Sequence, residues 1–159
     1  MIRVIGVGER YRRDDAVGLV VAERLRASLH RSRIEVMTAS GEGSDLMERW
    51  RGVDTAIVVD AVASDEEPTG TIHRWDAHEK PLPARIFPQS THLFSLPQAV
   101  ELARVLGELP RRLIVYGIVG ADFRMGEGLS ASVRVAIDEV VRRIESDTQA
   151  FVSAGNSDA

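Results

Sequence analysis

The sequence predicts an α/β protein, a three-layer α/β/α sandwich with a mostly parallel sheet of about five strands. Three short apolar runs, at residues 2–7, 55–59 and 113–119, are rich in β-branched residues and end beside glycine or aspartate. Such runs are typical of buried strands. Segments with helical spacing of apolar residues lie between them. Apolar strands that alternate with helices indicate a parallel sheet covered on both faces.

The first half of the chain supplies two helices and a strand between the first two apolar runs. We expect a helix from Asp15 to about His30, with an apolar stripe on one side and an acidic first turn. Gly18 inside that helix indicates close packing on the first strand, because glycine weakens a helix by about 1 kcal/mol relative to alanine. A strand at residues 33–39 and a short helix at residues 44–51 follow.

The second half supplies one edge strand and two further helices. A short strand is expected at residues 71–75, after a proline–glycine turn, and a long proline-containing loop at residues 76–91. Ser95 and Gln98 have the spacing of a capping box, which predicts a helix that runs to about Leu106. The last amphipathic helix is expected at residues 129–144.

Length and composition indicate one ordinary globular domain. The chain has 159 residues, of which 44% are hydrophobic and 28% charged, and a chain of this size buries about 68–70% of its unfolded surface. We expect a single domain at residues 1–145 and a polar, flexible tail at residues 146–159.

Charge and cysteine content exclude several classes of function. The net charge is −4, with acidic and basic residues interleaved, which argues against nonspecific binding of nucleic acid. The chain has no cysteine, so disulfides, thiolate metal sites and cysteine-protease chemistry are excluded. No apolar run approaches the roughly 18–20 residues of a membrane span, and no signal peptide is evident. We therefore expect a cytoplasmic protein without membrane insertion.

Two acidic residues follow strands that we expect to be neighbours. Asp15 comes after the first strand and Asp60 directly after the third. If the strand order is 2-1-3, the connections after strands 1 and 3 flank the point where ligands bind in open α/β sheets. His92, between the long loop and the next helix, is placed to reach the same edge. Two carboxylates and one imidazole suit a divalent metal ion such as nickel or zinc, and leave coordination positions open.

Each of these residues also has a structural explanation. For Asp14, capping of the following helix is the better interpretation, and for Asp15 capping and function are equally supported. Asp60 could simply bond loop amides, and a single histidine such as His92 is more often structural. His30, His73 and His78 show no partner pattern and are interpreted as surface residues. The basic run Arg10, Arg12 and Arg13 is interpreted as a solvated loop, and contact with an acidic or C-terminal part of a partner is the less favoured alternative.

Common catalytic motifs are missing from the sequence. It contains no G-x-S-x-G, H-E-x-x-H or G-x-x-x-x-G-K-[ST] pattern. The pair Gly6 and Gly8 lacks the third glycine of a dinucleotide fingerprint, so it supports only weakly a nucleotide- or phosphate-binding module. A metallohydrolase that keeps its own divalent ion remains a second alternative.

Taken in order, several motifs give the chain a family resemblance that spans about residues 1–144. They are Gly6-Val7-Gly8, Asp14-Asp15-Ala16-Val17-Gly18, Val58-Val59-Asp60-Ala61-Val62, the turn from Pro68 to Thr71, Ser90-Thr91-His92 before Leu96, and the late strand from Leu113 to Val119. The chain resembles the hydrogenase maturation proteases.

The resemblance implies an activity, a partner and a set of site residues. Members of the family are endopeptidases that remove a C-terminal extension from the [NiFe]-hydrogenase large-subunit precursor after its nickel–iron centre is assembled. Nickel in the precursor is thought to be the recognition element, so the metal is expected to arrive with the substrate. The family's acidic residues and histidine correspond to Asp15, Asp60 and His92, which makes these three the expected catalytic and metal-binding residues. No protein nucleophile is evident, and attack by water is expected.

Two positions depart from the family pattern. Glu9 replaces the asparagine that usually follows the first Gly-x-Gly, and residues 40–43 replace a Gly-Gly-Thr-like loop. The expected ligands are retained, whereas the contacts that select the client hydrogenase differ.

Overall fold

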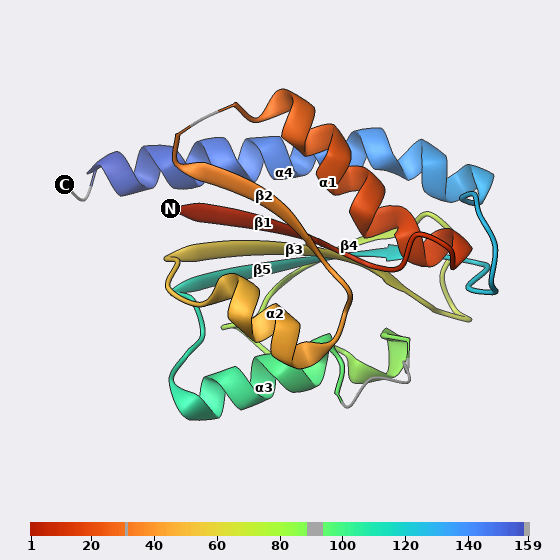
Figure 1. Cartoon of the computed structure of the whole chain (residues 1–159), viewed down its shortest axis with the longest axis horizontal. Coiled ribbons are helices and arrows are strands. Elements are labelled where there is room, and N and C mark those ends of the chain that lie inside the picture. Colours follow the sequence, from red (N-terminus) through yellow and green to blue (C-terminus); the bar gives the residue numbers. More distant parts are fainter. Residues whose placement is uncertain (31, 89–93, 158–159) are drawn as a thin grey trace.

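A computed structural model describes residues 1–30, 32–88 and 94–157 of the chain (Figure 1). Its sheet has five strands in the order β2-β1-β3-β5-β4, in which the first four are parallel and β4 runs antiparallel to β5. The strands are β1 (Ile2–Val7), β2 (Ile34–Ala39), β3 (Thr55–Val62), β4 (Ile72–Asp76) and β5 (Arg112–Val119). The predicted mostly parallel sheet is confirmed, and the 2-1-3 order on which the convergence of Asp15 and Asp60 was conditioned is present.

Helices cover both faces of the sheet. In Figure 1, α1 and α4 lie over one face, and α2 and α3 lie over the other. The helices are α1 (Val17–Ser28), α2 (Gly43–Trp50), α3 (Leu96–Leu106) and α4 (Ala131–Ser157), with short 3-10 helices η1 (Arg13–Ala16) and η2 (Ala84–Ile86). The architecture is therefore the predicted three-layer sandwich.

The central strand β3 divides the core into two layers. All eight of its residues are buried. Ile57 and Val59 pack on the side of α1 and α4, while Val58 packs on the side of α2 and α3. Successive side chains of a strand point to opposite faces, which explains why both faces of β3 need apolar residues.

Asp60 lies inside β3 rather than after it. The sequence predicted that the strand ends at Val59, but β3 continues to Val62 because it stays paired with β5, where Asp60 lies opposite Gly117. On its other side, the pairing with β1 ends at Gly6 and Val59. Asp60 is therefore the first residue of β3 beyond the end of the β1 pairing.

The prediction that a helix begins at Asp15 is wrong. A 3-10 turn occupies Arg13–Ala16, and α1 begins at Val17 with Ala16 as an N-cap that makes no side-chain capping bond. The prediction that Asp14 caps this helix is therefore wrong, and Asp15, for which capping was one of two open explanations, is not the N-cap either. The physical reason is that the Asp14 carboxylate bonds to the distant segment between β5 and α4.

The ends of the last two helices differ in how well the sequence predicted them. The capping box of α3 is confirmed, with Gln98 Oε1 accepting a hydrogen bond from Ser95 N at 2.9 Å.

The end predicted for the last helix, at residue 144, is wrong, because α4 continues to Ser157. Its polar extension is held to the sheet, since Asp147 accepts hydrogen bonds from Arg74 and Tyr116. Flexibility of residues 146–159 stays a prediction.

Although α4 is 27 residues long, no helix in the described parts of the chain combines the length and apolar character that crossing a membrane requires.

Gly18 allows α1 to approach the sheet closely, as predicted. A Cβ atom at this position would lie 2.3 Å from the carbonyl oxygen of Val7 and 2.5 Å from that of Val59. Both neighbours are strand backbone, which cannot move aside without disturbing the β1–β3 pairing. The placement of the first helix over the sheet therefore depends on the absence of a side chain here.

We predict that Gly18→Ala destabilises the protein by about 1–3 kcal/mol, because overpacking against backbone exceeds the gain in helix propensity. Gly155→Ala in α4 is the matched control, since a Cβ there meets nothing within 4 Å, and it leaves stability unchanged or slightly higher. Urea denaturation of both variants measures the difference. A Gly18→Ala variant as stable as Gly155→Ala would show that the helix does not depend on this contact.

Candidate active site

A small cavity opens at the carboxyl edge of the sheet, between the ends of β1 and β3. Its volume is about 70 Å³. Six segments of the chain contribute to its wall: the end of β1, η1 and the residues before it, the β2–α2 loop, β3, the loop before α3, and the loop after β5. The lining residues are Val7, Gly8, Glu9, Arg12, Asp15, Ser40, Gly41, Asp60, Pro88 and Phe123.

The cavity brings Asp15 and Asp60 together, although they are 45 positions apart in sequence. Both line it, so the prediction that they converge on one crevice is confirmed. His92 lies outside the described residues. The roles of all three side chains in binding and catalysis stay predictions.

The two carboxyl groups interact unfavourably when both are charged. Asp60 is 8% exposed. Burial is the main cause that raises its pKa well above the usual range, and repulsion from Asp15 raises it further. The hydrogen bond that Ala61 N donates to Asp60 Oδ1, at 2.8 Å, offsets part of this effect. A buried carboxyl with a raised pKa beside a second acid is typical of functional sites.

Asp15 is held at the cavity wall by backbone contacts on both sides. Its Oδ2 atom accepts a hydrogen bond from Glu9 N at 2.9 Å, and its own amide donates to Arg12 O at 3.0 Å. The segment from Glu9 to Asp15 therefore forms a closed loop. This loop fixes the direction in which the half-buried carboxylate points.

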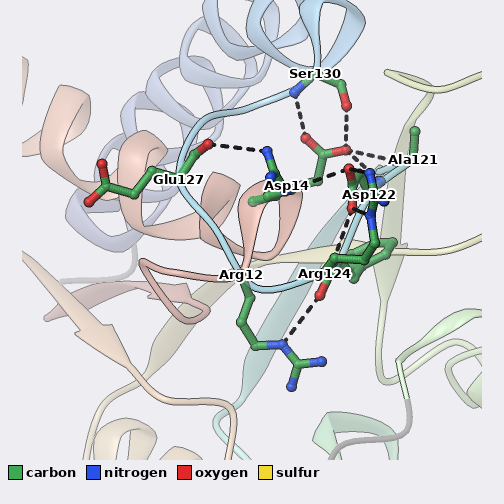
Figure 2. A network of polar contacts seen from close by, with 9 residues as sticks. Arg12, Asp14, Ala121, Asp122, Arg124, Glu127 and Ser130 are labelled. Carbon is green, nitrogen blue, oxygen red and sulfur yellow. Dashed lines mark hydrogen bonds and ion pairs between the residues drawn. The ribbon is translucent and has the colours of Figure 1, made fainter.

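Arg12 and Phe123 belong to the site, which the sequence did not predict. Arg12 was interpreted as part of a solvated basic run, but it lines the cavity, and its Nε donates to Phe123 O at 3.4 Å (Figure 2). Nearness to Asp15 in sequence could have pointed to Arg12. No sequence signal links Phe123 to it, because 111 positions separate the two residues.

Two of the other histidines have partners, contrary to the prediction. His73 Nε2 lies 2.8 Å from Glu67 Oε1, and its ring stacks on Trp75. His78 Nε2 lies 2.8 Å from the carbonyl oxygen of Pro110. Neither lines the cavity that holds Asp15 and Asp60.

The donors that the structure describes fit a cation only in part. Two carboxylates in a narrow, partly desolvated cavity favour a positive ion, because it would offset their mutual repulsion. Within residues 1–30, 32–88 and 94–157, no cluster of three or more His, Cys, Asp or Glu side chains is arranged to hold a metal ion. Among the described residues, the cavity therefore holds the two predicted acidic donors, Asp15 and Asp60, and Glu9 also lines it.

The glycine at the end of β1 has a packing role. A Cβ on Gly8 would lie 2.0 Å from the carbonyl oxygen of Asp15. The bare Cα of Gly8 thus lets the chain around Asp15 fold back against the end of the strand. Packing alone therefore explains why position 8 is glycine, and a phosphate-binding role is not needed to explain it.

Comparison with known proteins identifies the family. A family model described as hydrogenase maturation protease matches residues 19–147. The chain is 24% identical over 145 residues to the hydrogenase 2 maturation protease of Escherichia coli K12, an alignment that covers 90% of this chain and 87% of that protein. It is 29% identical over 139 residues to the hydrogenase expression/formation protein HupD of Thiocapsa roseopersicina, covering 87% of this chain and 61% of HupD.

Solved structures show the same fold. The hydrogenase maturating endopeptidase HybD from E. coli superposes with a TM-score of 0.81 at 23% identity, covering 94% of this chain and 93% of that one. The [NiFe] hydrogenase maturation protease HybD from Thermococcus kodakarensis has a TM-score of 0.69 at 20% identity, covering 91% and 97%. The family match begins within α1, includes β3 and continues into α4. The chain belongs to the hydrogenase maturation protease family and is a peptidase.

Proposed function

We propose that this peptidase removes the C-terminal extension of a [NiFe]-hydrogenase large-subunit precursor and recognises the nickel that the precursor carries. Asp15 and Asp60 bind the ion, with His92 as the third ligand. The observation that supports this proposal most directly is the pair of acidic side chains in one cavity of about 70 Å³. Repulsion between them raises the pKa of Asp60, after the larger effect of burial.

The same electrostatics explain why the ion would arrive with the substrate. Asp60 loses solvation on burial and gains a negative neighbour, so its ionised form needs a positive partner. A free ion would have to be stripped of water to enter so small a cavity. An ion already held by the precursor needs only its open positions filled by the carboxylates.

The surroundings of residues 89–93 support His92 as the third ligand. Pro88, on one side of this segment, lines the cavity. Phe94, on the other side, accepts a hydrogen bond through its carbonyl oxygen from Gly43 N at 3.1 Å. Gly43 follows Gly41 of the cavity wall by two residues. One described neighbour of the segment thus lines the cavity, and the other is bonded two residues from the cavity wall.

Water is the proposed nucleophile. Ser40 lines the cavity, and its Oγ accepts a weak hydrogen bond from Glu42 N at 3.5 Å. Among the described residues it is not paired with a base, as an activated serine would be. The bound ion would polarise the scissile carbonyl or lower the pKa of the attacking water.

Client selection is assigned to the two departures from the family pattern. Glu9 and two residues of the 40–43 loop, Ser40 and Gly41, all line the cavity. These residues would meet the precursor beside the cut peptide bond. The same segments that hold the acidic pair therefore also supply the surface that distinguishes one client from another.

The first prediction concerns the metal. Purified enzyme trims nickel-loaded precursor and leaves nickel-free precursor intact, as measured by mass spectrometry of the precursor's C-terminus. Metal analysis of the enzyme alone is the control, because stoichiometric bound metal would favour the self-contained metallohydrolase. Equal trimming of loaded and empty precursor would refute nickel recognition.

The second prediction concerns the ligands. Asp15→Asn, Asp60→Asn and His92→Ala each lower the trimming rate by more than about 100-fold, since changes outside the metal ligands themselves already cost 10–100-fold. Asp138→Asn is the matched control, because Asp138 lies on α4 away from the cavity and forms an exposed ion pair with Arg24. Trimming by a folded Asp15→Asn or Asp60→Asn variant at the rate of this control would exclude that residue from the site.

The third prediction concerns stability and pH. Burial and repulsion from Asp15 raise the pKa of Asp60 in the folded state. In the unfolded chain the pKa of an aspartate is about 3.9. The penalty for ionising Asp60 is absent below that pH, grows as pH rises toward the folded pKa, and is then constant. Asp60→Asn therefore raises Tm at pH 7 and above, and the gain disappears near pH 4. A gain independent of pH, or a loss at pH 7, would contradict the electrostatic account.

A further inference from the structure

Asp14, directly before Asp15, is fully buried and makes an unusual number of hydrogen bonds. Its Oδ1 accepts from Ser130 N at 2.7 Å. Its Oδ2 accepts from Ala121 N at 2.8 Å, Asp122 N at 3.0 Å and Ser130 Oγ at 2.7 Å. Figure 2 shows these donors gathered around one carboxylate. A single side chain thus ties the η1 turn to the segment between β5 and α4.

Backbone contacts join the same two segments. Arg13 N donates to Gly126 O at 3.1 Å, Gly126 N donates to Tyr11 O at 2.8 Å, and Asp14 N donates to Asp122 O at 3.0 Å. The residues on either side of Arg13 are therefore fixed against a segment more than 100 positions away. We refer to residues 120–130 as the 120–130 loop.

The η1 turn is strained, and this strain shows how firmly it is held. Arg13 has a φ angle of +48°. Among the residues that the structure describes, it is the only one other than glycine with a positive φ angle. This conformation is unfavourable for a residue with a side chain and persists only where the surroundings enforce it. The bonds made by Tyr11, Arg13 and Asp14 supply that constraint.

The strained turn directs two neighbouring acids to different places. Asp14 points into the protein toward Ser130, while Asp15 lines the cavity beside Asp60. The 120–130 loop also places Phe123 in the cavity wall, where its carbonyl oxygen accepts from Arg12. Asp14 therefore lies at the junction of the two segments that build one side of the site.

We propose that Asp14 is a positioning residue of the peptidase: its carboxylate locks the η1 turn to the 120–130 loop and thereby holds Asp15 against Glu9 N and opposite Asp60. Asp14 does not touch the substrate and acts through Asp15 and the Arg12–Phe123 wall. This inference rests on the proposed function of Asp15, and its test includes one readout that does not depend on activity.

The test compares three substitutions at the junction with one elsewhere. Asp14→Ala removes all four accepted bonds, Asp14→Asn retains one carbonyl acceptor, and Ser130→Ala removes a single hydroxyl donor. Asp147→Asn is the control. Asp147 also accepts several hydrogen bonds, from Arg74 and Tyr116, but it lies on α4 and does not line the cavity. All variants are assayed well below the lowest Tm of the set.

Two measurements decide the outcome. The kcat for trimming of nickel-loaded precursor falls by about 10–100-fold in Asp14→Ala, less in Asp14→Asn and least in Ser130→Ala, and stays within about threefold in Asp147→Asn. Amide hydrogen exchange at Glu9, which is bonded to Asp15 Oδ2 at 2.9 Å, becomes faster in the same order and is unchanged in Asp147→Asn.

A purely structural role for Asp14 gives a different result. Exchange would then become faster at Ala121, Asp122 and Ser130, whose amides bond Asp14 directly, while Glu9 would keep its wild-type protection. That pattern, or a wild-type kcat in folded Asp14→Ala, overturns the inference. If the wild-type enzyme fails to trim loaded precursor, the proposed function fails, and the exchange at Glu9 still decides whether Asp14 positions Asp15.

Discussion

The central constraint in this structure is the confinement of two acidic side chains in one small cavity. Asp60 is buried and Asp15 lies beside it, so burial and repulsion from Asp15 both disfavour the ionised form of Asp60. The fold tolerates this arrangement because the backbone on both sides is fixed. β3 continues past Asp60 by pairing with β5, and the loop from Glu9 to Asp15 closes on itself. A cation delivered by a partner would convert the repulsion into attraction.

The sheet order produces the cavity, and the loops complete it. β1 lies between β2 and β3, so the segments that leave β1 and β3 separate at the carboxyl edge and leave space between them. Gly18 keeps α1 close to this edge, where its Cα approaches strand carbonyls of both β1 and β3. The 120–130 loop also contributes Phe123 to the cavity wall. The end of β1, the end of β3 and the 120–130 loop are far apart in sequence, yet all three contribute to the site.

The sequence predicted the features that follow from local pattern, and it missed those that depend on distant partners. Apolar runs and glycine boundaries were enough to predict the strands, and the 2-1-3 order taken as a condition is the one that brings Asp15 and Asp60 together. The capping role of Asp14 was wrong, because its carboxylate bonds to residues 107–116 positions away, which helix propensity does not register. Likewise, α4 was predicted too short, since its polar extension is stabilised by Arg74 and Tyr116 of the sheet. Phe123 carried no local signal, because only the 120–130 loop's attachment to η1 brings it to the cavity.

The most direct test of the central claim is the coordination of the precursor's nickel before and after the enzyme binds. X-ray absorption at the nickel edge is measured for loaded precursor alone, with wild-type enzyme under conditions that slow trimming, and with an Asp15→Asn, Asp60→Asn double variant. The account predicts additional oxygen or nitrogen ligands with the wild-type enzyme and their loss with the double variant. A nickel spectrum unchanged by the wild-type enzyme in a demonstrated complex would contradict it.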